Sequence, residues 1–199
     1  MTIRNTPLPE DLYRRLSDLP APNVGDVLDR LYVLEAAVSA VWKGARVVGP
    51  AFTVMTAGGD NKYIHEAIDT AQPGDVLVID GQAATHRALL GDLMARRAQA
   101  RGLAGFVVDG AIRDAADLEE LAFPTWARAV TPAGPYRNGP GHLQVPVSVG
   151  RVVVNPGDVI VGDDDGVAVI QRHRLEEIVA AAEEKAASEA RARSQIAAL

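Results

Sequence analysis

The sequence predicts an α/β protein in which parallel strands are joined by helical crossovers, and three stretches support this class. Val76–Asp80 and Gly105–Asp109 are continuous apolar runs that end in aspartate. Such runs are typical of strands that are buried on both faces of a sheet. Between them, Asp92–Arg101 reads as a helix, and Gly102 follows it as a C-terminal capping residue. A strand, a helix and a second strand of this length form one parallel crossover unit.

The N-terminal part is expected to form two short helices. Pro9–Leu19 carries apolar residues near helical spacing, and Pro20 and Pro22 are expected to end this helix. A second helix is predicted over Asn23–Leu34, with the side chain of Asn23 as its N-terminal cap.

The rest of the chain alternates between strands, turns and helices. In chain order we expect a strand at Ala45–Thr56 interrupted by Gly49-Pro50, a polar turn at Gly58–Asn61, a helix at Lys62–Ala71, a loop at Ala83–Leu90 that carries His86 and Arg87, a helix at Asp117–Leu121, a strand at Thr125–Ala129, a long turn at Thr131–Gly141, strands at Val145–Val154, Val159–Gly162 and Gly166–Ile170, and an Ala-rich helix at Leu175–Leu199. The run Asp163–Gly166 lacks EF-hand spacing and predicts a hairpin turn.

No linker is visible, so residues 1–199 are predicted to form a single domain. The last helix is expected either to lie on a neighbouring subunit or to project into solvent.

Composition narrows the function classes. A net charge of −6 and a pI near 5.2 disfavour nonspecific binding to nucleic acid, and Arg96, Arg97 and Arg101 are interpreted as a solvated helix face. The absence of cysteine excludes disulfides, thiolate catalysis and cysteine-ligated metals. No apolar run approaches the roughly 18 residues that span a bilayer. The polar, charged N-terminus is unlike a secretory signal. We therefore expect a cytoplasmic protein without nucleic acid or membrane partners.

Two polar clusters stand at the turning points of the predicted crossover. Gly91-Asp92 begins the helix, and Arg113-Asp114 follows the second strand; twenty residues separate Asp92 from Arg113. A crossover of this length could return both clusters to the same end of the sheet, where open α/β sheets usually bind ligands. Arginine binds carboxylates through two parallel hydrogen bonds, and aspartate offers hard oxygen ligands for Mg²⁺ or Mn²⁺. The structural alternative is a surface salt bridge or a helix cap.

The start of the predicted helix is a candidate anion site. If Gly91 lies at its entrance, the backbone amides of Leu93 and Met94 lack intrahelical acceptors and point outward. Asp92 could cap this helix, or it could hold a water for proton transfer.

Other recognised motifs are absent. The four histidines, His65, His86, His142 and His173, lack metal-binding spacing and are interpreted as structural or surface residues, with His86 the best outside candidate. No Walker loop, GxGxxG or GxSxG motif is present.

Four motifs together resemble the RraA-like family, over roughly Asn23–Ile170. The motifs are GDN at 59–61, PGDVLVIDG at 73–81, GDLMARRAQARGLAGFVVDGAIRDAAD at 91–117 and NPGDVIVGDDDGVAVI at 155–170. This family includes metal-dependent 4-hydroxy-4-methyl-2-oxoglutarate/4-carboxy-4-hydroxy-2-oxoadipate aldolases and regulators of ribonuclease E activity. The aldolases of this family share a signature: an acidic residue, twenty further residues, Arg-Asp, and another acidic residue three positions after the aspartate. In this chain Asp92, Arg113, Asp114 and Asp117 match it.

The resemblance implies a compact αββα sandwich, similar to the swivelling phosphohistidine domain, that assembles as trimers or pairs of trimers with active sites between subunits. It implies that Asp114 ligates a divalent cation, Mg²⁺ or Mn²⁺, and that Arg113 binds the carboxylate of a small 2-oxo acid. The amides of Leu93 and Met94, beside Gly91, would help to hold that carboxylate. Asp92 would position the water that shuttles protons.

The implied activity is that of a class II aldolase, a metal-dependent lyase that releases pyruvate and decarboxylates oxaloacetate as a side reaction. The family's aldolases also use an acid from a neighbouring subunit, for which Glu176, Glu177, Glu183 and Glu184 are candidates. Two alternatives stay open: a noncatalytic regulator of ribonuclease E activity, and a family lyase acting on another 2-oxo acid. Family regulators tend to lack the aspartate that follows the arginine, so Asp114 favours an enzyme.

Overall fold

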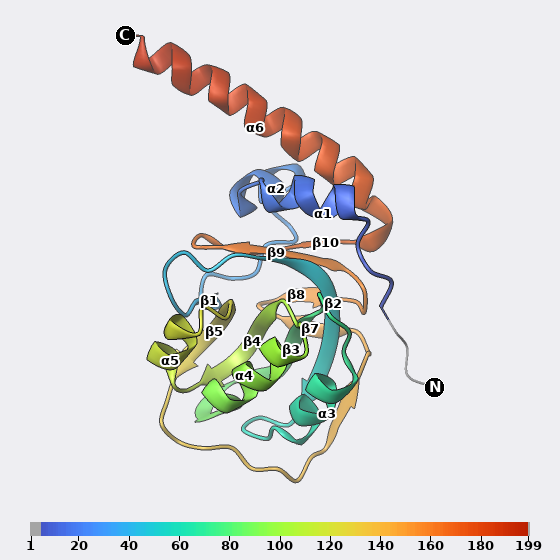
Figure 1. The fold of residues 1–199 in the computed structure, drawn as a ribbon, viewed down its shortest axis with the longest axis vertical. Coiled ribbons are helices and arrows are strands. Elements are labelled where there is room, and N and C mark those ends of the chain that lie inside the picture. Colours follow the sequence, from blue (N-terminus) through green and yellow to red (C-terminus); the bar gives the residue numbers. More distant parts are fainter. Residues whose placement is uncertain (1–4, 199) are drawn as a thin grey trace.

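The computed structural model describes residues 5–198 and shows a central sheet with helices around it (Figure 1). The helices are α1 (Glu10–Ser17), α2 (Ala21–Val27), α3 (Lys62–Thr70), α4 (Asp92–Ala100), α5 (Ala115–Glu120), the 3-10 helix η1 (Arg172–Arg174) and α6 (Leu175–Ala197). The strands are β1 (Ser39–Ala40), β2 (Val47–Thr56), β3 (Val76–Ala88), β4 (Gly105–Ile112), β5 (Thr125–Val130), β6 (Gly141–Leu143), β7 (Val147–Val149), β8 (Val152–Val154), β9 (Val159–Asp163) and β10 (Gly166–Ile170).

The main sheet has the strand order β1-β5-β4-β3-β2-β9-β10, and β6 also pairs with β2. Strands β2, β3, β4 and β5 run parallel to one another. The other strands of this sheet pair antiparallel: β1 with β5, β6 and β9 with β2, and β10 with β9. β7 and β8 form a separate hairpin. The mixed α/β class predicted from the sequence is confirmed.

Side-chain alternation along β3 explains why its sequence is apolar throughout. Leu77 and Ile79 pack with α3, α4 and α5 in one core cluster, while Val76 and Val78 pack with the β7–β8 hairpin in another. A strand covered on both faces has no polar side, since successive residues point to opposite faces. A third cluster joins α1, α2 and the first turns of α6 to β9 and β10.

The predicted crossover is confirmed: β3 and β4 are adjacent and parallel, with Asp80 opposite Asp109, and α4 connects them. The predicted helices at α1, α3 and α4 and the strands at β9 and β10 also form, within one or two residues at each end.

The second predicted helix is wrong in its bounds. α2 begins at Ala21, before Asn23, and ends at Val27 instead of Leu34. Pro22 suits the first turn of a helix because its missing N–H needs no partner there. The chain then turns through Asp29 and Arg30, which both have positive φ, and Val33 forms an isolated bridge to Ala168.

Two strand predictions are also corrected. β2 runs through Gly49-Pro50 without interruption, because the strand changes partner there: residues 47–50 pair with β9 and residues 51–55 with β3. β3 continues to Ala88, so most of the expected loop at Ala83–Leu90 is strand with register shifts.

The predicted strand at Val145–Val154 is a hairpin. Gly150 and Arg151, with φ of 52° and 67°, form the tight turn between β7 and β8, and such turns require positive φ at both central residues. The predicted helix at Asp117–Leu121 begins earlier, at Ala115.

The predicted C-terminal helix forms as α6, and Leu199 lies outside the described residues. Its buried residues, Leu175, Ile178, Val179 and Ala182, all belong to the first turns, and the remainder extends away from the sheet (Figure 1). None of the helices in the described part of the chain combines the length and apolar character that a membrane crossing requires.

Candidate functional site at the start of α4

The two polar clusters predicted from the sequence meet in the structure. The backbone amide of Asp92 donates to Asp114 Oδ2 at 3.2 Å, and the amide of Arg113 donates to the carbonyl of Leu90 at 3.0 Å. Because β3 and β4 are parallel, the segments that follow them emerge at the same edge of the sheet. The crossover therefore joins Asp92 and Asp114, which lie 22 positions apart in the chain.

Asp114 has an unusual backbone conformation. Its φ of 58° and ψ of 40° are left-handed, and its carboxylate does not cap α5. Aspartate and asparagine tolerate this conformation better than most residues. The turn directs the carboxylate back toward α4, where Oδ2 lies 3.4 Å from Arg113 Nε. The salt bridge that the sequence offered as a purely structural alternative is therefore present between Arg113 and Asp114. It lies within the cluster that Asp114 forms with the start of α4.

Gly91 is the residue that precedes α4, and its φ of −159° is extended. Asp92 is the first residue of the helix and does not cap it; its carboxylate forms an ion pair with Arg96, with Nε to Oδ2 at 3.3 Å. By helix geometry, the amides of Leu93 and Met94 in the first turn have no intrahelical acceptor. They form a candidate anion site beside Arg113.

A pocket of about 220 Å³ opens at this helix terminus. Its lining residues come from α3 and the residue before it, from α4, and from the segments that follow β3, β4 and β5: Asn61, His65, Leu90, Gly91, Leu93, Met94, Arg113, Pro135 and Arg137. Four of the predicted residues, Gly91, Leu93, Met94 and Arg113, thus line one pocket. The carboxylates of Asp92 and Asp114 are partly exposed and lie beside this lining, not within it. His86 is outside the lining as well.

Three polar lining residues were not predicted as site residues from the sequence. Asn61 belongs to the GDN motif, which was interpreted as a polar turn; His65 was set aside as structural; Arg137 lies in the turn that is rich in glycine and proline. Asn61 is 5% exposed, and its Oδ1 has no hydrogen-bond partner among residues 5–198. A buried acceptor without a partner is costly, so Asn61 is prepared to accept a hydrogen bond from a ligand.

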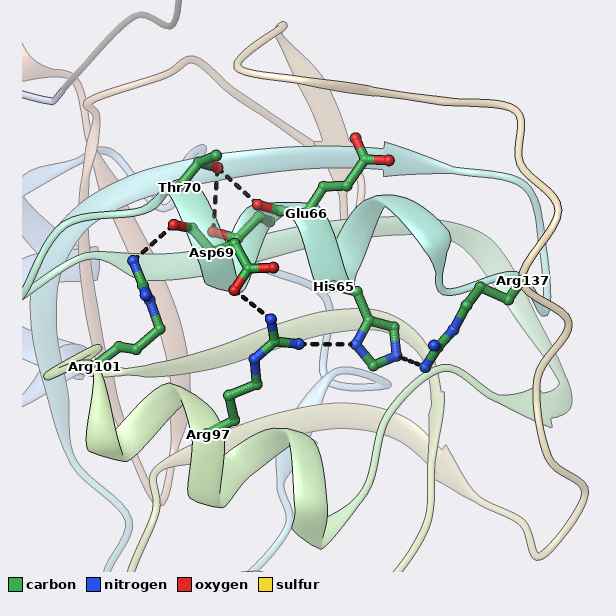
Figure 2. Close-up of polar contacts among 8 residues, drawn as sticks. His65, Glu66, Asp69, Thr70, Arg97, Arg101 and Arg137 are labelled. Atoms are coloured by element: carbon green, nitrogen blue, oxygen red, sulfur yellow. Dashed lines mark hydrogen bonds and ion pairs between the residues drawn. The ribbon is translucent and has the colours of Figure 1, made fainter.

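His65 lies between two guanidinium groups, as Figure 2 shows. Arg97 approaches Nδ1 at 3.3 Å and Arg137 approaches Nε2. Burial, together with the charges of Arg137 and Arg97, lowers the pKa of His65 below its ordinary value, and Asp69 only partly opposes this. A neutral imidazole has a single acceptor nitrogen, so it can satisfy only one of the two arginines.

The two arginines around His65 differ in their other partners. Arg97 forms an ion pair with Asp69. For Arg137, no carboxylate within the described ranges lies at ion-pair distance. Arg137 is therefore an uncompensated cation at the pocket, on the wall that faces α3 (Figure 2).

The donor set near Asp114 fits a cation that keeps most of its water. No group of three or more acidic or histidine side chains that could enclose a metal is present among the described residues. Asp114 Oδ2 accepts from Asp92, while its side chain is about one-third exposed at 31%. Mg²⁺ is commonly bound by one or two carboxylates with water and substrate oxygens, so a single accessible carboxylate suits it.

Comparison with known proteins places the chain in a family. The RraA-like family model, described as Aldolase/RraA, matches residues 21–169. A protein of Halalkalibacterium halodurans named "Putative 4-hydroxy-4-methyl-2-oxoglutarate aldolase" is 42% identical over 92% of this chain and 88% of its own. A Burkholderia multivorans protein with the same name is 39% identical over 70% of this chain and 84% of its own.

Among solved structures, Streptomyces coelicolor RraAS2, titled an unusual member of the RNase ES inhibitor RraA protein family, is 31% identical. Its TM-score is 0.85, over 97% of this chain and 99% of that chain. The family match and the mixed α/β fold thus define an Aldolase/RraA type of protein. The chain belongs to the RraA-like family.

Proposed function

We propose that this protein is a divalent-metal-dependent lyase that cleaves 4-hydroxy-4-methyl-2-oxoglutarate-type 2-oxo acids and releases pyruvate. Oxaloacetate decarboxylation would be a side reaction of the same site. The observation that carries the proposal is the convergence of Asp92, Arg113 and Asp114 at one helix terminus, with Asp92 N 3.2 Å from Asp114 Oδ2. The names of the relatives, which are those of aldolases, support the same reaction class.

In this proposal the 2-oxo acid is held by its carboxylate. Arg113 lines the pocket and offers a planar pair of donors that matches a carboxylate. The amides of Leu93 and Met94 add two further donors at the positive end of α4. The substrate would thus be oriented with its reactive carbons toward the carboxylates of Asp92 and Asp114.

Asp114 would hold the cation, Mg²⁺ or Mn²⁺, directly. When bound, such a cation polarises the 2-oxo carbonyl and stabilises the negative charge that develops as the carbon–carbon bond breaks. Asp92 would orient a water that moves a proton from the 4-hydroxyl group to the carbon that becomes the methyl group of pyruvate. The pocket lining contains none of the three lysines, Lys43, Lys62 and Lys185, so the proposal uses no Schiff base.

The opposite wall of the pocket suits the second half of a dicarboxylate. Arg137 would face the far carboxylate, and Asn61 Oδ1 would accept a hydrogen bond from the bound ligand or its water. Among the described residues, Arg137 forms no ion pair with a carboxylate, and Asn61 Oδ1 has no hydrogen-bond partner.

The same proposal includes assembly. We expect a homotrimer or hexamer of αββα units similar to swivelling phosphohistidine domains, with active sites at subunit interfaces and a cytoplasmic location. The exposed part of α6 offers one surface for such contacts.

Purified protein should release pyruvate from 4-hydroxy-4-methyl-2-oxoglutarate with Mg²⁺ or Mn²⁺ and lose this activity in EDTA. Asp114→Asn tests the cation site sharply, because asparagine tolerates the left-handed backbone and keeps one acceptor for Asp92 N. We expect kcat/KM to fall by about a hundredfold or more in Asp114→Asn. Asp164→Asn, the same change in the β9–β10 turn, should leave it unchanged. Full activity of Asp114→Asn, or activity in EDTA, would contradict the proposal.

A regulator of ribonuclease activity is the second candidate, because RraAS2 matches this chain over nearly its whole length. A lyase acting on another 2-oxo acid is the third. Pyruvate release that depends on Asp114 would favour the first function. Inhibition of a purified ribonuclease E, unaffected by Asp114→Asn and without pyruvate release, would favour the second.

A further inference from the structure

The loop formed by residues 131–140, between β5 and β6, carries Pro135 and Arg137 into the pocket wall. Apart from an isolated bridge between Asp60 and Tyr136, this loop has no strand or helix of its own. The position of Arg137 therefore depends on how the loop is attached to the body of the protein.

Arg87, near the end of β3, attaches the middle of this loop. Its Nη1 donates to the carbonyl of Gly134 and its Nη2 to the hydroxyl of Tyr136, both at 2.9 Å. The guanidinium also lies over the Tyr136 ring, 4.2 Å from its centroid, a favourable cation–π arrangement. No carboxylate in the described part of the chain forms an ion pair with Arg87, so its polar contacts are directed to the loop.

Asp60 attaches the far end of the loop. This carboxylate is 4% exposed and accepts from the amide of Asn138 at 2.5 Å and from that of Lys62 at 2.9 Å. Burial raises the pKa of Asp60, but backbone hydrogen bonds from Asn138, Lys62 and Gly139 outweigh it, and the net pKa lies below the ordinary value. The carboxylate is therefore charged when it holds the loop.

The backbone between these two attachments is paired with the segment before α3. Tyr136 N donates to the carbonyl of Gly59 at 2.8 Å, and Asn61 N donates to the carbonyl of Tyr136 at 3.0 Å. Arg137 follows Tyr136 directly, so a shift of Tyr136 would move Arg137 relative to His65 and the pocket.

We infer that Arg87 is a positioning residue, which holds residues 134–136 so that Arg137 faces the far carboxylate of a dicarboxylate substrate. The inference rests on the proposed lyase function and deepens it. Arg87 lies outside the pocket lining and acts on the substrate only through Arg137.

The test separates the two ends of the substrate. Cleavage of 4-hydroxy-4-methyl-2-oxoglutarate requires the far carboxylate, whereas exchange of the pyruvate methyl protons in D₂O requires only the near one. In Arg87→Met, KM for the dicarboxylate should rise about tenfold, because a misplaced charged partner loses much of its binding contribution. The rate of pyruvate exchange should remain within about twofold of the wild type.

Arg46→Met is the matched control. Arg46 also donates two bonds to backbone carbonyls, those of Ser17 and Leu19 at 3.1 and 3.0 Å, but far from the pocket. It should change neither reaction. Arg87→Lys keeps a cation over Tyr136 and one donor for Gly134, so its KM should lie between those of wild type and Arg87→Met.

A double-mutant cycle tests whether Arg87 acts through Arg137. Arg137→Gln should raise KM for the dicarboxylate, and adding Arg87→Met to it should have no further effect, because the two changes remove the same interaction. Additive effects would overturn the inference, as would an equal loss of both reactions in Arg87→Met.

Hydrogen exchange provides a readout that needs no activity. In Arg87→Met the amides of Tyr136 and Asn138 should exchange about tenfold faster, while Val107 and Val108 in β4 stay protected. Unchanged exchange at Tyr136 would overturn the positioning role. If the wild type neither cleaves nor exchanges pyruvate, the proposed function fails, and the amide exchange alone still decides whether Arg87 holds the loop.

Discussion

A Cβ atom at position 91 would collide with the carboxylate of Asp114. Built on the backbone of Gly91, it lies 2.2 Å from Asp114 Oδ2 and 2.8 Å from Arg113 Cγ. The extended φ of Gly91 suits any residue, so it is space, and not backbone conformation, that requires glycine here. The start of α4 and the end of β4 are thereby brought into direct contact at the candidate site.

Gly91→Ala should therefore reduce activity without unfolding the protein. The new methyl group displaces Asp114 and Arg113, and a displacement of about 1 Å at a reacting group can lower a rate by about a hundredfold. Steady-state kinetics and circular dichroism measure the two effects. Gly134→Ala is the control, since its Cβ would meet only Arg113 Nη1, at an ordinary contact distance of 3.6 Å. Equal losses in both variants would argue against a specific collision.

The pKa of His65 should respond to its neighbours. Burial and the charges of Arg137 and Arg97 lower this pKa, so removing one charge in Arg137→Gln should raise it. NMR titration of the imidazole Cε1 proton measures the shift. A pKa that stays the same or falls would show that Arg137 does not act on the ring.

The lowered pKa of His65 also makes the free energy of unfolding depend on pH. As pH falls, the unfolded chain takes up the His65 proton before the folded chain does, so stability present above the unfolded pKa is lost below about pH 6.5. Replacement of His65 by Gln should weaken this loss between pH 7.5 and 5.5. Denaturant unfolding at the two pH values tests it, and an acid sensitivity equal to that of the wild type would contradict it.

Arg128 should matter for stability. It forms ion pairs with Asp109 and Glu35, and Asp109 also accepts from Gly150 N at 2.7 Å. Arg128→Met leaves the buried carboxylate of Asp109 without its cation, which should cost about 3 kcal/mol in the free energy of unfolding. Arg15→Met removes a largely exposed pair with Glu183, which solvent screens, so it should cost much less. Urea denaturation would compare them, and similar losses would refute the distinction.

The role of α6 can be settled by truncation. Removal of residues 188–199 leaves all of its buried residues in place, so the fold should persist. If α6 lies on a neighbouring subunit, sedimentation velocity should show a smaller assembly than that of the full chain. If the truncated protein assembles with the same number of subunits as the full chain, α6 instead projects into solvent.

Local sequence signals were sufficient for the crossover that builds the site. The apolar runs of β3 and β4 and the glycine after α4 are short-range features, and each element begins at the residue that these features predicted. The bounds of β2 and β3 were not predictable in this way. Gly49-Pro50 resembles a break, yet the strand continues because β9 and β3 pair with its two halves.

The sequence by itself determined the α/β class, the helix start at Asp92 and the adjacency of Arg113 to Asp114. Only the tertiary structure decided that these groups share a pocket with Asn61, His65 and Arg137. The physical reason is that a residue's own neighbours fix its local conformation and chemistry. In contrast, Arg137 reaches the pocket only because hydrogen bonds from β3 and from the segment before α3 hold its loop, and such contacts between distant segments leave no periodic pattern in the chain.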